Sequence, residues 1–183
     1  MKTLPAAQST PLEFRATRPI KARIIRILTG LLIFVAFPCL ANNEIDLVRV
    51  LKSERKLILL SEGKIRREFR ISLSSNSVGP KQQEDDQRTP EGRYILDYRV
   101  RNSGFHKALH VSYPNTEDTE AAVEAGQSPG GQILIHGQPN GFGWLAFLNQ
   151  RFDWTDGSIA LNNRDMDVVW RLVKPGTPID LLP

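Results

Sequence analysis

The feature that most constrains the fold of this chain is a series of short apolar segments separated by turn-forming residues. These segments cover residues 45–51, 57–60, 65–71, 94–100, 109–112, 132–136 and 179–182. In residues 65–71 the apolar side chains alternate with arginines, which is the pattern of a strand with one solvated face. Runs of this length are typical of strands rather than helices, so the sequence predicts a mostly β protein with few helices.

Two segments have the residue spacing and the end signals of helices. Residues 116–125 begin with Thr116 as a candidate N-cap and are followed by glycine, which favours a helix end. Residues 164–173 follow Asn163, a second candidate N-cap, and repeat apolar side chains three and four positions apart. A shorter helical turn is predicted at residues 144–148.

One long connection separates the first three predicted strands from the rest. Residues 74–92 are polar and rich in turn formers, which predicts an exposed loop. The loop ends in Thr89-Pro90-Glu91-Gly92, where proline presets φ and glycine permits positive φ, so a tight turn is expected.

The first 41 residues have the composition of an export signal. Residues 27–37 form an apolar run that is short for a membrane span, and Arg23 and Arg26 precede it. Small residues follow, so cleavage is expected after Ala41; the alternative is an uncleaved anchor in the inner membrane. We therefore predict a signal peptide or N-terminal anchor over residues 1–41 and one folded domain over residues 44–183.

The distribution of charge argues against nucleic-acid binding. Residues 1–41 contain six of the 24 basic side chains and one of the 20 acidic ones. The remainder is close to neutral, and a nucleic-acid-binding domain normally has a concentration of basic side chains. Contact with a membrane is expected only through the N-terminal segment.

The single cysteine limits the chemistry that is available. Cys39 lies in the predicted leader and would be removed by cleavage after Ala41. Lipidation at Cys39 is disfavoured, because Phe37-Pro38 lacks the small residues that such a site prefers. The mature chain is then expected to have no disulfide, no thiolate metal site and no thiol nucleophile.

Two segments place a candidate base and a candidate nucleophile about two dozen residues apart. A buried strand is predicted to end at His136-Gly137, and the turn Asp156-Gly157-Ser158 follows later in the chain. A hydroxyl beside an imidazole is a common arrangement for acyl transfer. Taken alone, His136 could equally be a structural histidine, and Gly157-Ser158 an ordinary turn.

Several further segments share a family pattern with these two. In chain order they are Thr89-Pro90-Glu91-Gly92-Arg93-Tyr94, His106, Ala108-Leu109-His110-Val111-Ser112-Tyr113-Pro114-Asn115, Pro129-Gly130-Gly131, Ile135-His136-Gly137, Asp153-Trp154-Thr155-Asp156-Gly157-Ser158-Ile159-Ala160, Asn163, Met166-Asp167 and Gly176-Thr177-Pro178-Ile179. Together they resemble the L,D-transpeptidase catalytic domain (YkuD-type), in the branch with an Asp-Trp-Thr-x-Gly-Cys-Ile-Ala signature. The resemblance covers roughly residues 44–183.

The resemblance implies a mostly β, β-sandwich-like fold. It places the protein in the envelope of a bacterium, after export to the periplasm. It also implies acyl transfer or hydrolysis on peptidoglycan stem peptides, at the amide that follows diaminopimelate, with envelope proteins linked to peptidoglycan as further candidate partners. By position, His136 matches the catalytic histidine, and Gly137 and Gly157 match the glycines beside the base and the nucleophile. Ser158 stands where the family has its nucleophilic cysteine.

The exchange of cysteine for serine leaves three interpretations open: an impaired or inactive enzyme, an active serine enzyme, or an altered sequence. A thiol near pKa 8.5 is readily activated by histidine, whereas a hydroxyl needs a base, a group that orients the base and an oxyanion hole. The sequence assigns no acidic orienting residue, although Asp153 and Asp156 are near. A non-catalytic homologue that binds peptidoglycan or regulates a relative is therefore the alternative function.

Four other residues are candidates for substrate binding: His110, Tyr113, Trp154 and Asn163. His110 lies on a predicted strand and could instead pack or form a structural hydrogen bond. Trp154 and Tyr113 could line a peptide groove or belong to the core, and Asn163 keeps the asparagine of the branch. No His, Cys or carboxylate cluster has metal-ligand spacing, so neither a metal nor another cofactor is expected.

Overall fold

A computed structural model describes residues 44–100, 102–145 and 152–183 of the chain, all within the compact unit Leu40–Pro183. The predicted leader, with its cleavage site, lies outside the described residues. So does most of the predicted helical turn at 144–148, of which the 3₁₀ helix η1 (Gly143–Leu145) includes the first two residues.

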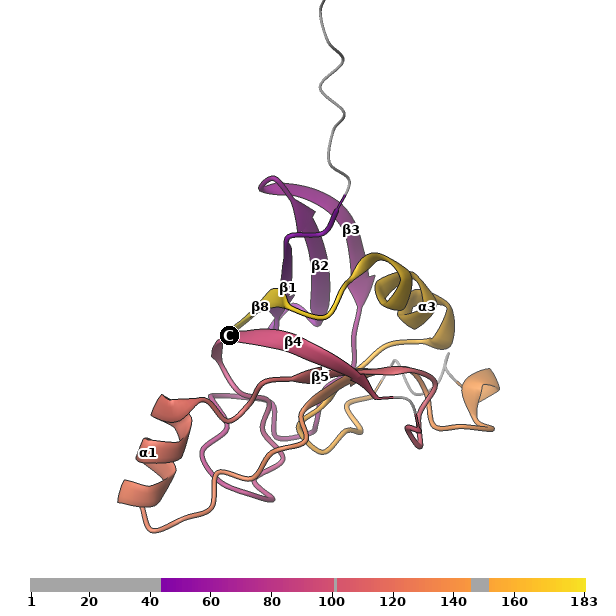
Figure 1. The fold of residues 1–183 in the computed structure, drawn as a ribbon. Helices are drawn as coiled ribbons and strands as arrows, with labels where there is room; N and C mark the ends of the chain where they lie inside the picture. Colours follow the sequence, from indigo (N-terminus) through magenta and orange to yellow (C-terminus); the bar gives the residue numbers. More distant parts are fainter. Residues whose placement is uncertain (1–43, 101, 146–151) are drawn as a thin grey trace, which may run out of the picture. The chain divides into compact units, whose positions relative to one another are not determined.

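Eight strands form a single mixed sheet (Figure 1). The strands are β1 (Leu47–Leu51), β2 (Lys56–Ser61), β3 (Lys64–Arg70), β4 (Gly92–Val100), β5 (Ala108–Val111), β6 (Leu134–His136), β7 (Ile159–Ala160) and β8 (Thr177–Leu182). Their order across the sheet is β3-β2-β1-β8-β4-β5-β6-β7. The β1–β8 and β6–β7 pairs are parallel, and the other neighbours are antiparallel.

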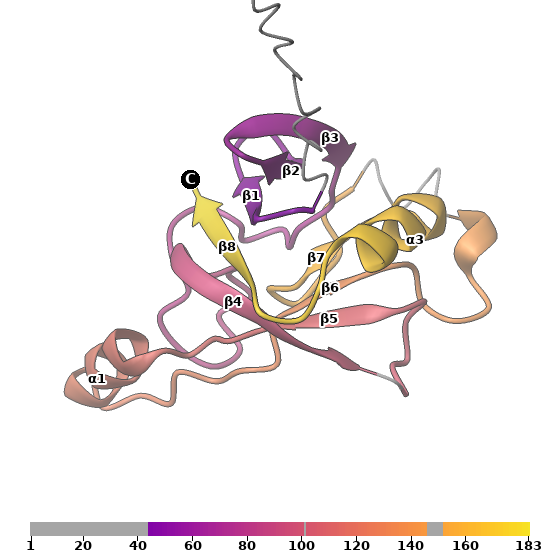
Figure 2. The same cartoon turned by 45° about the horizontal axis from the view of Figure 1, so that its top comes forward.

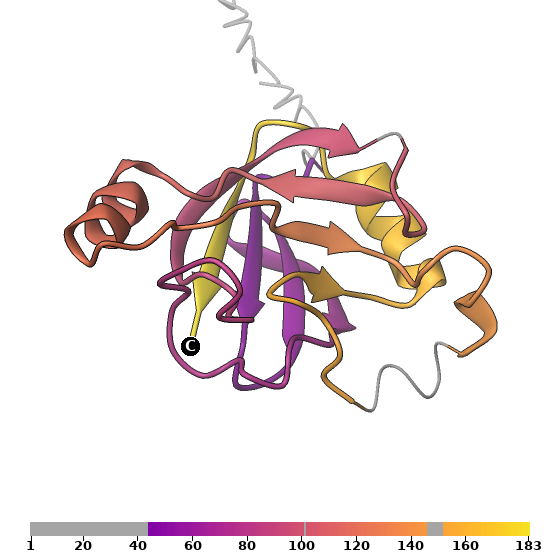
Figure 3. The same ribbon diagram turned by 90° about the horizontal axis from the view of Figure 1, so that it is seen from below.

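The sheet curls until its two ends meet. Ser72, just after β3, exchanges two backbone hydrogen bonds of 2.9 Å with Ala160 of β7, at the other end of the strand order. Seen from below, β1–β3 run across the direction of β4–β7 (Figure 3). The prediction of a mostly β fold with a few short helices is confirmed, and one curled sheet takes the place of two separate layers.

The core fills the interior of this curl. Leu57 and Leu59 of β2 are fully buried there, and the last helix, α3 (Asn163–Leu172), adds Met166 and Val169. The helix lies in the opening between β1–β3 and β5–β7 (Figure 2). Its apolar residues fall on one face because they are spaced three and four positions apart. The periodicity in the sequence therefore identified the face that packs on the sheet.

Both helix N-caps lie one residue earlier than predicted. The first helix, α1 (Thr116–Glu124), is capped by Asn115, whose side chain accepts from Asp118 N–H while the Asp118 carboxylate accepts from Asn115 N–H. This reciprocal arrangement satisfies two backbone donors, which a cap at Thr116 could not do. Similarly, Asn162 caps α3 by accepting from Asp165 N–H.

The connection between β3 and β4 is a loop, as predicted, but several of its residues are buried. Ser74 and Thr89 are inaccessible to solvent, and Lys81 is nearly so. Lys52, from the turn after β1, reaches into this segment, where its ammonium donates to Gly79 O (2.6 Å), Thr89 O (3.0 Å) and the Glu91 carboxylate (2.8 Å). A buried ammonium requires such partners, so the segment is held in one conformation.

Candidate active site

The strand β6 ends at His136, and the local backbone fixes its ring. Nδ1 lies 2.7 Å from the carbonyl oxygen of Gly137. Because a carbonyl only accepts, Nδ1 must carry the proton in this contact, and the neutral ring then has an unprotonated Nε2. Burial lowers the pKa of His136 to about 4, although the Gly137 contact opposes this shift. The imidazole is therefore neutral at pH 7, as a general base must be.

Two aromatic side chains cover the imidazole. Phe105 stacks on it with the ring centroids 3.9 Å apart, and Trp154 meets it edge-on at 5.8 Å. His136 is only 1% exposed as a result. These rings restrict the orientation of the imidazole and remove water from most of its surface, which is the physical reason for its low pKa.

Gly137 is required by close packing. A Cβ at this position would lie 2.5 Å from His106 O and 2.8 Å from Asn163 Oδ1. The Asn163 side chain also accepts from Gln138 N–H at 2.8 Å, so the first residue of α3 holds the backbone that follows the histidine. Asn163 thus supports the base through the main chain.

Ser158 lies in a turn, directly after a position that requires glycine. Gly157 has φ +92°, and a Cβ there would lie 2.6 Å from Arg88 O. The Ser158 hydroxyl accepts from Leu134 N–H at 3.2 Å. Within the described part of the chain, no hydrogen bond joins this hydroxyl to His136. The position of Ser158 is therefore set by the backbone of the turn and by the hydrogen bond from Leu134 of β6.

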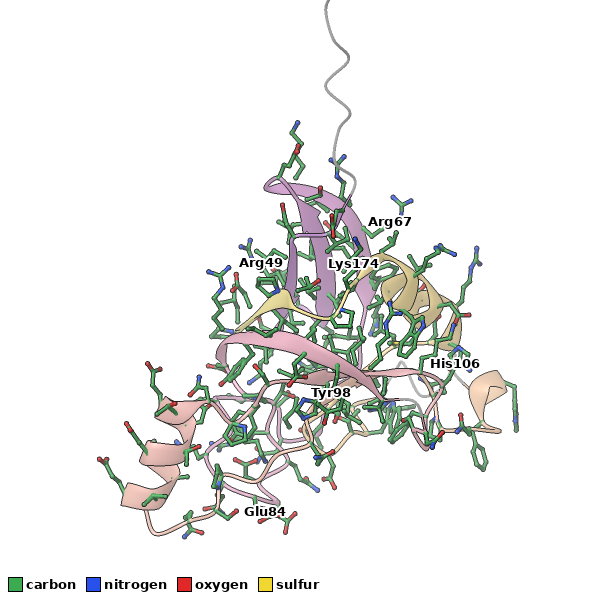
Figure 4. All side chains as sticks on the ribbon, in the orientation of Figure 1. Arg49, Arg67, Glu84, Tyr98, His106 and Lys174 are labelled. Atoms are coloured by element: carbon green, nitrogen blue, oxygen red, sulfur yellow. The ribbon has the colours of Figure 1, made fainter. Side chains whose placement is uncertain are left out.

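Ser158, His136 and Trp154 line the same cleft, which has a volume of about 670 Å³. The strand β6 and the turn that precedes β7 contribute residues to the cleft, and so does the β3–β4 loop. Glu84 of that loop points outward from the molecule (Figure 4). Its backbone N–H donates to Ser128 O at 2.8 Å, so the loop is tied to the Pro129-Gly130-Gly131 segment beside the cleft.

The group that orients the base is a backbone carbonyl rather than a carboxylate. Asp153 is engaged elsewhere: Arg55 donates to both of its carboxylate oxygens at 2.6 to 3.1 Å, and Leu73 N–H donates to one at 3.0 Å. Burial alone would raise the pKa of Asp153, but these hydrogen bonds hold it below its ordinary value. Asp156 is exposed at the edge of the cleft.

The sequence pattern of the YkuD family, described as the L,D-transpeptidase catalytic domain, matches residues 45–181. The chain belongs to this family. A relative, named "Putative L,D-transpeptidase YafK" in Escherichia coli (strain K12), is 29% identical over 112 residues, which are 58% of this chain and 44% of YafK. The match therefore spans less than half of that relative.

Two solved structures share the fold of this YkuD-family chain. Bd1075 from Bdellovibrio bacteriovorus superposes with a TM-score of 0.51 at 22% identity, over 75% of this chain and 47% of that one. The L,D-transpeptidase from Mycobacterium smegmatis gives a TM-score of 0.50 at 15% identity, over 75% of this chain and 58% of that one. At such identities the similarity concerns the fold alone.

Of the four residues predicted to bind substrate in this YkuD-family domain, only Trp154 lines the cleft; His110, Tyr113 and Asn163 do not. His110 pairs across β5–β6 with Leu134, a cleft residue, but its own Nδ1 contacts Asp97 at 2.8 Å and its ring stacks on Tyr98. Tyr113 donates its hydroxyl to Pro129 O at 2.9 Å, and burial raises the pKa of Tyr113 to about 12. Tyr113 supports a loop of the cleft, and all three binding assignments stay predictions.

Sequence reasoning missed Phe105 and the residues of the β3–β4 loop that line the cleft. Phe105 stands directly before His106 in the family pattern, so its position was the available signal. The loop residues gave no such signal, because their polar composition is that of any solvated loop. Among the described residues, no group of three or more His, Cys, Asp or Glu side chains is arranged to hold a metal.

Proposed function

We propose that this chain is an envelope protein that binds peptidoglycan stem peptides in the cleft, and that its acyl transfer or hydrolysis at the diaminopimelate-centred amide is impaired by Ser158. The observation that supports the proposal most directly is that a neutral, oriented His136 and Ser158 line one cleft. Its family, the L,D-transpeptidases, acts on peptidoglycan peptides. In the part of the chain that the structure describes, this cleft brings the base and the family's nucleophile position together.

The impairment follows from the strength of the base. An imidazole with a pKa of about 4 takes a proton from a thiol far more readily than from an alcohol, whose own pKa is several units higher. In serine hydrolases a buried carboxylate stabilises the imidazolium as it forms. Here the Nδ1 partner is the neutral Gly137 carbonyl, which stabilises the imidazolium less.

A non-catalytic homologue that binds peptidoglycan or regulates an active relative is the second candidate. One observation favours it: the Ser158 hydroxyl is held by Leu134 N–H, a contact that uses the serine as a structural acceptor. In this alternative the cleft binds stem peptides without cleaving them. Peptidoglycan-linked envelope proteins are then further candidate partners.

The location of the domain is part of the same proposal. The basic and apolar leader supports export to the periplasm or cell envelope, either with cleavage after Ala41 or with retention as an anchor. Over residues 44–100, 102–145 and 152–183 no helix has the length and apolar character needed to cross a bilayer.

The test compares the protein with its Ser158→Cys variant. Each is incubated with tetrapeptide muropeptides, and released D-alanine and cross-linked products are followed by mass spectrometry. We expect product from the variant and at least about 100-fold less from the serine protein, because the rest of the site is intact. A serine protein as fast as the cysteine variant contradicts the impairment.

Two controls separate the candidates. The Ser158→Cys, His136→Asn double variant should lose the activity gained, since the base is absent. Binding of tetrapeptide to the unmodified protein, measured by calorimetry, should be retained in both candidates. An inert Ser158→Cys variant that still binds favours the non-catalytic homologue, and the absence of binding contradicts both.

A further inference from the structure

The Thr89-Pro90-Glu91-Gly92 segment contacts the nucleophile turn, although nothing so far assigns it a part in the chemistry. Thr89 is completely buried, and its hydroxyl donates to Gly157 O at 2.9 Å. The preceding carbonyl, Arg88 O, occupies the space that a Cβ on Gly157 would need. The segment is thus packed directly against the peptide that joins Gly157 to Ser158.

A hydrogen bond to one end of a peptide group fixes the other end. In a trans peptide the C=O of one residue and the N–H of the next point in opposite directions. The bond from Thr89 to Gly157 O therefore directs the N–H of Ser158 away from Thr89. The carbonyl of Ser158 is bound in turn by the Thr155 hydroxyl at 2.7 Å. Two threonine hydroxyls thus hold the peptide groups on both sides of the Ser158 Cα.

Within the described part of the chain, the N–H of Ser158 donates no hydrogen bond. Neither the strand pairing of β6 with β7 nor the turn hydrogen bonds include it as a donor. A backbone N–H normally has a partner, and one that lacks a protein acceptor beside a cleft is available to a ligand. Ser158 itself lines the cleft.

The backbone of Thr89 is fixed by Lys52. The Lys52 ammonium, only 2% exposed, donates to Thr89 O at 3.0 Å and to the Glu91 carboxylate at 2.8 Å. A hydroxyl on such a fixed backbone can hold its acceptor with little freedom. Preorganised donors stabilise developing charge better than mobile ones, because no reorganisation is needed during the reaction.

We propose that Thr89 is a positioning residue, which holds the Gly157–Ser158 peptide so that the Ser158 N–H donates to the oxyanion formed during acyl transfer. This rests on the proposed acyl-transfer chemistry of the cleft. In that step the nucleophile adds to the carbonyl carbon, its proton passes to His136, and the carbonyl electron pair moves to oxygen. Collapse of the adduct re-forms the carbonyl and expels the leaving group, which takes the proton from His136, and the N–H stabilises only the charged adduct.

The experiment uses two reactions of the Ser158→Cys variant that differ in one respect. Acetylation by p-nitrophenyl acetate forms a thioester through an oxyanion and releases p-nitrophenolate. Alkylation by iodoacetamide displaces iodide at carbon and forms no oxyanion. Both require the thiolate, so both report on His136 and on the fold, and only the first reports on the N–H donor.

We expect Thr89→Val, in the Ser158→Cys background, to slow acetylation by about tenfold or more while alkylation changes by less than about twofold, since loss of an oxyanion donor outright costs 100-fold or more. Thr89→Ser should restore acetylation. If valine prevents folding, Thr89→Ala removes the hydroxyl without placing a methyl group against the carbonyl and makes the same comparison.

Equal slowing of both reactions overturns the proposal, because it assigns Thr89 a structural role only. So does an unchanged acetylation rate. The two small reagents need no recognition of a stem peptide. A positive result with an inert tetrapeptide assay therefore rejects the proposed substrate and retains the role of Thr89, whereas the reverse outcome rejects the role of Thr89 alone.

Discussion

Two histidines on neighbouring strands have similar local contacts and different surroundings. His136 of β6 and His110 of β5 each present Nδ1 to an oxygen, at 2.7 and 2.8 Å. Each ring also stacks on an aromatic ring, Phe105 in one case and Tyr98 in the other. The oxygen is the carbonyl of Gly137 for His136, and the carboxylate of Asp97 for His110.

The difference shows that a carboxylate beside a histidine does not identify the histidine that lines the cleft. The pair His110–Asp97 has the composition of two members of a catalytic triad, yet neither residue lines the cleft. The histidine in the cleft has a neutral partner, which fixes the tautomer and leaves the ring uncharged. That support suits a thiol nucleophile better than a hydroxyl, which is the basis of the proposed impairment by Ser158.

Replacing each of the two histidines in turn should separate their roles most clearly. In the Ser158→Cys background, His136→Asn should slow acetylation by p-nitrophenyl acetate about 100-fold or more, because the general base is lost. His110→Asn should change the rate by less than about threefold, as expected for a residue outside the chemistry. Stopped-flow absorbance of p-nitrophenolate measures both. A comparable loss in the two variants would show that the carboxylate-bound histidine takes part in catalysis.

The second difference concerns acid stability. The pKa of His136 in the folded protein, about 4, lies below its ordinary value of 6.5, so on acidification the unfolded chain binds the proton first. The neutral His136 therefore makes its full contribution to the free energy of unfolding above about pH 6.5, and this contribution is lost as the pH falls towards 4. It amounts to about 3 kcal/mol in the free energy of unfolding.

Urea unfolding between pH 4 and 7 measures this contribution. Carboxylates such as Asp153 also lose stabilising contacts in acid, so the variant His136→Asn provides the reference. The pH dependence should be shallower in His136→Asn than in the unmodified protein. Parallel curves for the unmodified protein and His136→Asn would contradict a buried, neutral His136.

Much of this fold follows from local patterns in the sequence. The β2 and β4 strands follow from short apolar runs, and the face of α3 follows from its period. The closure of the sheet could not be predicted, because the Ser72–Ala160 contact joins residues far apart in the chain. The exact cap of α3 was missed for a local reason: Asn162 and Asn163 are equally good N-caps by type, and in the structure Asn162 accepts from Asp165 N–H while Asn163 accepts from Gln138 N–H.

The site could be predicted as far as its family pattern extends. His136 and Ser158, chosen by position, line the same cleft, and the close contacts at Gly137 and Gly157 give the physical reason for each glycine; the catalytic roles stay predictions. The orienting carbonyl could not be found, because every residue has a backbone carbonyl and the sequence does not show which one faces a ring. Phe105 was missed since an aromatic residue beside a strand is ordinarily part of the core.

The smallest effect is expected from the stacked rings. Phe105→Leu removes the ring over His136 and gives water more access to it, so the pKa of His136 should rise by about one unit from its value near 4. The free energy of unfolding should fall by about 1 kcal/mol, the value of an aromatic pair. Titration of the imidazole resonances by NMR measures the pKa. Tyr98→Leu is the matched control, because Tyr98 stacks on His110 and should leave the titration of His136 unchanged; a shift of His136 in that variant would mean that the two rings are coupled across the β5–β6 pair.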